Sequence, residues 1–298
     1  MAESAIQNFN HLKIHTQYSI CEGAVKIDDL QDFAKSNKIK SLALCDTSNL
    51  CGALEFAEKI SKVGTQPIIG TQINFKFGDT VGLLPLFSLN EEGYKRIIKL
   101  SSLSFLENDE LSDPHVDFSN LLENNKGVAI FSGTTFGLFG ELFNKGKFSE
   151  IHDLYKKLNS TFGDRFYIEI QRHNDQNELG FEKFNLNKSL ELKIPIIATN
   201  EVFYINQDMH EAHDALICIG NKTYINEKNR KRLSNQHYFK SNSEMSELFA
   251  DLPEALENNY NFPLRCNFRP LFSNPILPNI SSEKGGNADD LLKKDSLS

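Results

Sequence analysis

The sequence predicts an α/β fold, and within that class it favours a barrel of strand–helix units. Short apolar runs alternate along the chain with stretches in which apolar residues recur at helical spacing. Apolar strands that alternate with helices are typical of a parallel sheet covered on both faces. Polar residues stand where several of these runs end, and in a barrel those ends meet at one mouth. An open doubly wound sheet also gathers its strand ends at one edge, so the spacing alone leaves both architectures open.

The predicted elements follow from local pattern. Ile27, Leu30, Phe33 and Ala34 form one face of a helix, and the apolar run that follows it ends on Asp46. Residues 107–125 are polar and are expected to form an irregular surface insertion. The expected strands are residues 41–46, 67–75, 81–87, 127–132, 166–171 and 195–199, and the expected helices are residues 91–103, 137–144, 151–162 and 179–192.

The character of the chain changes after about residue 240. Residues 243–259 are expected to be helical, with Pro253 opening a second helix, because proline is favoured in a first helical turn. Residues 263–278 are rich in proline and lack periodicity. Residues 289–294 resemble the start of another helix, which suggests that the native chain continues past Ser298.

Composition limits the class of protein. The 298 residues are 40% hydrophobic with 23 Phe, which is ample for a buried core, and the formal net charge of −8 disfavours a nucleic-acid clamp. No apolar run approaches the roughly 20 residues that span a bilayer. A soluble, cytoplasmic protein with no membrane contact is expected. The five cysteines lack CxxC spacing and are expected to be reduced thiols: Cys21, Cys45, Cys51, Cys218 and Cys266.

A histidine-rich segment near the N-terminus is the first candidate site. In an extended segment His11, Lys13 and His15 would share a face, because side chains two apart point the same way. Imidazole nitrogens bind transition metals, but the cation of Lys13 would repel one. Taken alone, His11 and His15 are therefore interpreted as structural. The polar residues expected at the barrel mouth are Asp46, Ser132, Gln171, His173, Asn200 and Glu201.

Several longer phrases then identify a family. NHLKIHTQYSICEG, SLALCDTSNLCGALEFAEKI, QPIIGTQI, FYIEIQRH, IIATNEVFYINQDMHEAHDALICIG and SEMSELFADLPEAL occur in that order. Together they resemble the N-terminal PHP (polymerase and histidinol phosphatase) domain of bacterial replicative polymerase alpha subunits. The resemblance covers residues 8–270. It implies that residues 271–298 are a linker and the truncated start of the next, polymerase region.

The resemblance implies a distorted (β/α) barrel of PHP type with a short helical and irregular C-terminal extension. Intact members hold a cluster of metal ions at the barrel mouth, where it would activate water for phosphoester hydrolysis. Matched position by position, this chain retains only part of that ligand set. His15, Asp46 and His173 are retained and Glu22 and Glu201 are possible substitutes, whereas Lys13, Thr47, Gln72, Thr134 and Phe203 replace ligands.

These replacements predict that the mouth holds no metal and that this segment contains no catalytic residue. We expect the ammonium group of Lys13 to take the place of the metal charge and to satisfy Asp46 and Glu22. Cofactors are accordingly not expected.

Two functions follow from the resemblance. In the first, the chain is a catalytically degenerate scaffold that stabilises the polymerase and docks its proofreading exonuclease, and DNA is contacted mainly by the full polymerase. In the second, it is a metal-dependent phosphoesterase or 3′–5′ exonuclease that uses Zn, Mn or Mg with a relaxed ligand set. A free histidinol-phosphatase-like enzyme is a weaker third reading, because the phrases after residue 195 are of the polymerase type.

Overall fold

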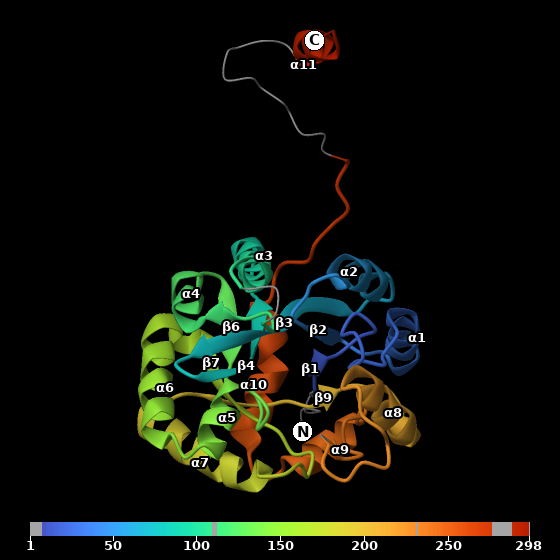
Figure 1. Cartoon of the computed structure of the whole chain (residues 1–298). Helices are drawn as coiled ribbons and strands as arrows, with labels where there is room; N and C mark the ends of the chain where they lie inside the picture. Colours follow the sequence, from blue (N-terminus) through green and yellow to red (C-terminus); the bar gives the residue numbers. More distant parts are fainter. Residues whose placement is uncertain (1–7, 109–111, 231, 276–287, 298) are drawn as a thin grey trace.

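The computed structural model describes residues 8–108, 112–230, 232–275 and 288–297. Within these ranges nine strands form one curled sheet in the order β8-β7-β6-β4-β3-β2-β1-β9, with β5 paired to β3, and helices surround it (Figure 1). The strands are β1 His11–Ile14, β2 Ser41–Thr47, β3 Gln66–Phe77, β4 Thr80–Ser88, β5 Val116–Asp117, β6 Val128–Phe131, β7 Phe166–Ile170, β8 Ile196–Ala198 and β9 Glu201–Val202.

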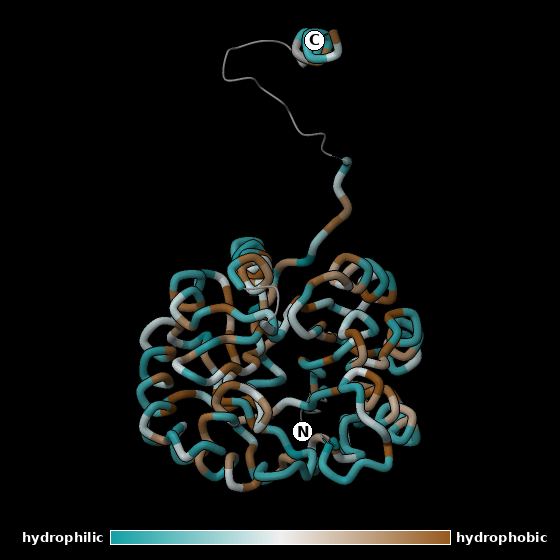
Figure 2. The backbone as a smooth tube through the Cα atoms, in the orientation of Figure 1, coloured by the Kyte–Doolittle hydropathy of each residue, from teal (hydrophilic) through white to brown (hydrophobic). Residues whose placement is uncertain are grey.

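The helices alternate with these strands as the sequence pattern predicts. Figure 2 shows hydrophobic and hydrophilic residues alternating along them, as expected for helices with one buried face. The helices are α1 Ile27–Asn37, α2 Ala53–Lys62, α3 Glu91–Leu106, α4 Phe118–Glu123, α5 Leu138–Asn144, α6 Phe148–Phe162, α7 Glu178–Leu192, α8 His210–Gly220, α9 Asn242–Leu248, α10 Pro253–Asn261 and α11 Ala288–Ser296.

A single extended segment joins the two ends of the sheet. Its first part, β8, pairs in parallel with β7, and after two residues its second part, β9, pairs in parallel with β1. The backbone N–H of Thr199 donates to the Ile170 carbonyl, and the His15 N–H donates to the Val202 carbonyl. The segment therefore closes the curled sheet into a distorted barrel, which confirms the predicted fold class.

Two local predictions were wrong. Strand β4 runs antiparallel to both β3 and β6, so the sheet is mixed and not all-parallel. The turn between β3 and β4 contains Gly78 and Asp79, and Gly78 has φ +59°, a conformation that favours glycine. The predicted irregular insertion at residues 107–125 contains β5 and α4, which bury Val116, Phe118 and Leu121 against the core.

The barrel interior is divided into an apolar layer and a polar layer. On β7, Tyr167 belongs to the apolar cluster and Glu169, two residues further on, belongs to the polar mouth. On the segment that closes the barrel, Ile197 likewise belongs to the apolar cluster and Glu201 to the polar mouth. The apolar layer is completed by Phe262 beyond α10, whose ring packs against Phe87, Phe131 and Tyr167. This layer supports the charged groups at the mouth from below.

No helix in the described part of the chain is long and apolar enough to span a membrane.

Candidate functional site

A buried ion pair lies at the centre of the barrel mouth. Lys13 on β1 and Glu201 on β9 are partners in the register of the two strands, and Lys13 Nζ lies 2.9 Å from Glu201 Oε1. The same ammonium lies 3.7 Å from Oε1 of Glu169 on β7. All three side chains are buried, with Lys13 only 1% exposed. Lys13 therefore stands as a fixed positive charge between two carboxylates.

The charges in this cluster depend on one another. Burial alone favours the neutral form of Glu201, but Lys13 and a hydrogen bond from His15 outweigh it and hold the Glu201 pKa well below its usual range. Burial likewise opposes the charge of Lys13, but the Glu169 and Glu201 carboxylates raise its pKa above the ordinary value. Burial raises the pKa of Glu169, against the attraction of Lys13. Lys13 and Glu201 thus form an ionised pair.

Asp46 has different partners from those expected. Its Oδ1 accepts hydrogen bonds from the Thr16 N–H at 2.6 Å and from Ser19 Oγ at 2.7 Å, and its Oδ2 accepts from Thr16 Oγ1 at 2.7 Å. Burial raises the pKa of Asp46, although these hydrogen bonds oppose the shift. Asp46 therefore anchors the loop after β1 to the end of β2.

Glu22 also does not pair with Lys13. It accepts a hydrogen bond from the hydroxyl of Thr47, which in turn accepts one from Gln72 Nε2 at 3.0 Å. The expectation that Lys13 satisfies Asp46 and Glu22 is wrong. Its partners are Glu201 and Glu169, because the register of β1 and β9 and the curl of the sheet place them opposite the lysine.

Four of the replaced positions line a cleft at this ion pair: Lys13, Gln72, Thr134 and Phe203. Glu22, a possible substitute ligand, lines it as well, so the mouth brings these residues together. Thr134 uses its hydroxyl locally, accepting a hydrogen bond from the Phe136 N–H at 3.1 Å.

Phe203 packs against two histidines. Its ring stacks on His15, with centroids 4.5 Å apart, and also on His213, with centroids 5.3 Å apart. His15 Nε2 lies 3.1 Å from Glu201 Oε1, and His213 Nε2 lies 2.8 Å from the Glu22 carbonyl oxygen. Phe203 is 4% exposed. An apolar ring thus packs against the imidazole of the retained residue His15.

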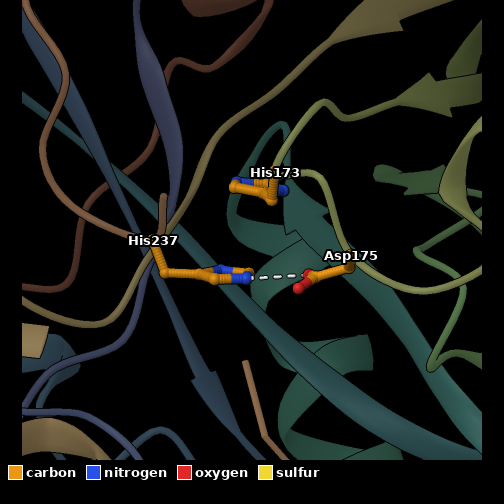
Figure 3. Close-up of side chains that lie close together, drawn as sticks. All are labelled: His173, Asp175 and His237. Carbon is orange, nitrogen blue, oxygen red and sulfur yellow. Dashed lines mark hydrogen bonds and ion pairs between the residues drawn. The ribbon is translucent and has the colours of Figure 1, made fainter. Parts of the chain in front are cut away.

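His173 belongs to a second cluster, which Figure 3 shows. Its ring lies parallel to that of His237, with centroids 4.2 Å apart and an interplanar angle of 5°. His237 Nε2 lies 2.9 Å from Asp175 Oδ2. One nitrogen or oxygen atom from each of the three residues lies within 4.8 Å of the others. Imidazole and carboxylate groups at this spacing are the donor types that hold a transition-metal ion.

Three residues of the mouth were not foreseen from the sequence. Glu169 lies in a run that was predicted only as an apolar strand. A charged residue inside a buried strand, on the same face as Gln171, could have indicated that it belongs to the barrel mouth. Asp175 follows His173 by two residues. His237 lies 62 residues beyond Asp175, and no local pattern connects the two.

Comparison with known proteins identifies the family. A model of the PHP domain matches residues 11–173. The chain belongs to the PHP domain family. The DNA polymerase III subunit alpha of Rickettsia conorii is 39% identical over 291 residues, which cover 96% of this chain and 24% of that protein. The corresponding subunit of Caulobacter vibrioides is 35% identical over 301 residues, covering 98% of this chain and 26% of that protein.

These relatives confirm the resemblance to the PHP domain of polymerase alpha subunits. The chain spans about a quarter of the length of the curated relatives it matches. Among solved structures, an amidohydrolase from Chromobacterium violaceum with bound sulfate aligns with a TM-score of 0.43 and 10% identity, covering 70% of this chain and 96% of that one.

The metal cluster that the PHP family implies does not fit the residues of this mouth. An ammonium group occupies the position expected for an imidazole ligand and is held by Glu201 at 2.9 Å. The ring of Phe203 occupies a second such position and packs directly on His15. A dication between these groups would face the charge of Lys13 in a dry environment and would lose two ligands.

Proposed function

We propose that this PHP domain is a noncatalytic scaffold module at the amino terminus of a DNA polymerase III alpha subunit. The observation that carries the proposal is the Lys13–Glu201 pair at the centre of the mouth. Phosphoester hydrolysis at a metal cluster needs dications that activate water and stabilise the developing charge. A lysine ammonium neutralises carboxylates, but it cannot lower the pKa of a bound water in that way.

The proposed partners are the remainder of the polymerase alpha chain and a proofreading exonuclease subunit. The names and the coverage of the relatives support the first of these. The net charge of −8 fits a module that meets other proteins, with DNA contacted mainly by the rest of the polymerase. On this proposal the barrel stabilises the longer chain and offers its surface for docking.

Hydrolysis assays test the lack of catalysis. The purified chain is incubated with a chromogenic thymidine phosphodiester and Mn²⁺ or Zn²⁺, and His15→Ala is assayed in parallel. We expect no metal-dependent release above the blank for either protein. Metal-dependent release that His15→Ala abolishes would overturn the scaffold assignment and establish the phosphoesterase alternative.

Binding and synthesis assays test the module itself. An immobilised chain is expected to retain purified exonuclease subunit at physiological salt, whereas an unrelated barrel protein of similar net charge does not. A primer-extension assay on the chain alone is expected to be blank. Failure to retain the exonuclease would remove the docking role but would leave the hydrolysis result unaffected.

A further inference from the structure

A cavity of about 320 Å³ lies beside the amino-terminal ends of β1 and β2. Its lining comes from three segments: residues 8–11, residues 33–40 from the end of α1 to the start of β2, and residues 239–244 around the start of α9. It shares no lining residue with the two clefts of the barrel mouth. Cavities of this size hold small ligands in many proteins.

Aromatic rings form one wall of this cavity. The ring centroid of Phe239 lies 3.8 Å from that of His11 and 4.7 Å from that of Phe33, and Phe9 meets His11 edge-on at 5.3 Å. Phe33 and Phe239 are only half-buried. Burial lowers the pKa of His11 to about 3, so its ring is uncharged at neutral pH. Such a wall offers apolar surface against which a planar aromatic group can stack.

The charged side chains of the cavity favour an anion. Lys38 and Lys40 line it, are exposed, and form no ion pair within the described part of the chain. Glu244 also lines it, but its carboxylate already accepts hydrogen bonds from the Tyr238 hydroxyl at 2.6 Å and from the Ser241 N–H at 2.7 Å. The chain as a whole carries a net charge of −8, so two unpaired lysines beside an aromatic wall give this cavity a local charge opposite to the total.

Two amide side chains supply further polar groups. Asn242 uses its Oδ1 to accept the Phe9 N–H at 2.6 Å, and Asn37 uses its Nδ2 to donate to the Phe33 carbonyl at 2.9 Å. Among the described residues, Nδ2 of Asn242 and Oδ1 of Asn37 have no other hydrogen-bond partner. One donor and one acceptor are therefore left for the polar edge of a ligand.

We propose that this cavity binds a small planar aromatic ligand that carries an anionic group, of the size and chemistry of a nucleoside monophosphate. The ring of the ligand packs against Phe33 and Phe239, and the anion pairs with Lys38 and Lys40. Neither contact involves the ion pair of the barrel mouth, so the proposal stands independently of the scaffold role.

Isothermal titration calorimetry of the intact chain tests the proposal with two probes, deoxyadenosine monophosphate and phenyl phosphate. We expect saturable binding of at least one of them, at one equivalent per chain. Deoxyadenosine lacks the anion and inorganic phosphate lacks the ring, so each is expected to bind at least about tenfold more weakly than the probe that binds. Equal binding of deoxyadenosine or of inorganic phosphate would contradict a site that recognises both parts of the ligand.

Variants of the lining locate the site. Lys38→Gln combined with Lys40→Gln should weaken binding by at least about tenfold, and Phe33→Leu by about fivefold. The matched control, Lys26→Gln combined with Lys35→Gln, removes the same charge from exposed lysines at the two ends of α1 that do not line the cavity. No saturable binding of either probe, unchanged binding in the cavity variants, or an equal loss in the control would each overturn the proposal. Circular dichroism confirms that every variant is folded.

Discussion

The two halves of the barrel mouth neutralise their buried acids in different ways. In the lysine half (Lys13, His15, Glu169 and Glu201) the chain supplies its own cation, 2.9 Å from Glu201. In the histidine half (His173, Asp175 and His237) the acid is held by an imidazole, and the donors are of the type that binds metals. A mouth can therefore lose a metal cluster without losing its carboxylates, provided that another positive charge reaches them.

The largest effect is expected from removing the cation of the lysine half. Lys13→Met keeps the volume of the side chain but leaves Glu201 and Glu169 buried without it, so the free energy of unfolding should fall by about 4 kcal/mol. Urea denaturation measures the loss. The double variant Lys13→Met with Glu201→Gln should regain part of the stability. A loss in Lys13→Met no larger than that of a surface lysine would show that the pair is unimportant.

Phe203 packs against both halves, and its removal should have the next largest effect. Phe203→Ala deletes a ring that packs on His15 at 4.5 Å and lies 5.4 Å from His237, so a cavity forms beside both histidines. The expected loss is about 3 kcal/mol in the free energy of unfolding. Phe203→Leu is the control and should cost less, because it fills more of the space. Equal losses in the two variants would argue against the cavity explanation.

The histidine half should be the more sensitive to acid. Burial holds the pKa of His173 well below its usual value, so the folded protein binds fewer protons than the unfolded chain when the pH falls below about 6.5. Stability is present above that pH and is lost as the pH falls towards the folded pKa. His173→Gln should reduce the slope of unfolding free energy against pH, by an amount that rises to about 1.4 kcal/mol per pH unit well below pH 6.5.

Urea midpoints between pH 7 and pH 5 measure that slope. The His173→Gln variant should still show a slope between pH 7 and pH 5, because burial also lowers the pKa of His11 to about 3. His11→Gln is therefore the matched comparison. An unchanged slope in His173→Gln would mean that His173 titrates alike in the folded and unfolded states.

The smallest effect is expected at the rim. Glu22 is half-buried and bonds to Thr47, and it has no contact with Lys13 among the described ion pairs. Glu22→Gln should change the unfolding free energy by no more than about 1 kcal/mol, as for a single hydrogen bond. A loss as large as that of Lys13→Met would restore the original hypothesis that Lys13 satisfies Glu22. The comparison between these two variants thus tests the partner assignment directly.

The sequence alone determined that strands and helices alternate, although it did not predict α2, β5, α4 or β9. The residues that replace family ligands follow from the resemblance to the PHP domain and remain a prediction. Strand β2 and helix α7 lie within a residue of the predicted limits. Strand β2 is a short, continuously buried apolar run, which is a local feature of the sequence. Lys13 and Phe203 could be recognised as misfits for a metal cluster from their side-chain chemistry. The domain limits at residues 8–270 and 271–298 remain a prediction.

Only the tertiary structure decided which charges meet. Lys13 reaches Glu201 because β9 pairs with β1 where the barrel closes, and it reaches Glu169 because the sheet curls. His237 joins Asp175 across 62 positions of the chain. Contacts of this kind depend on strand register and on the path of distant segments. Local periodicity records whether a side chain is buried, but it carries no information about which distant side chain is buried beside it.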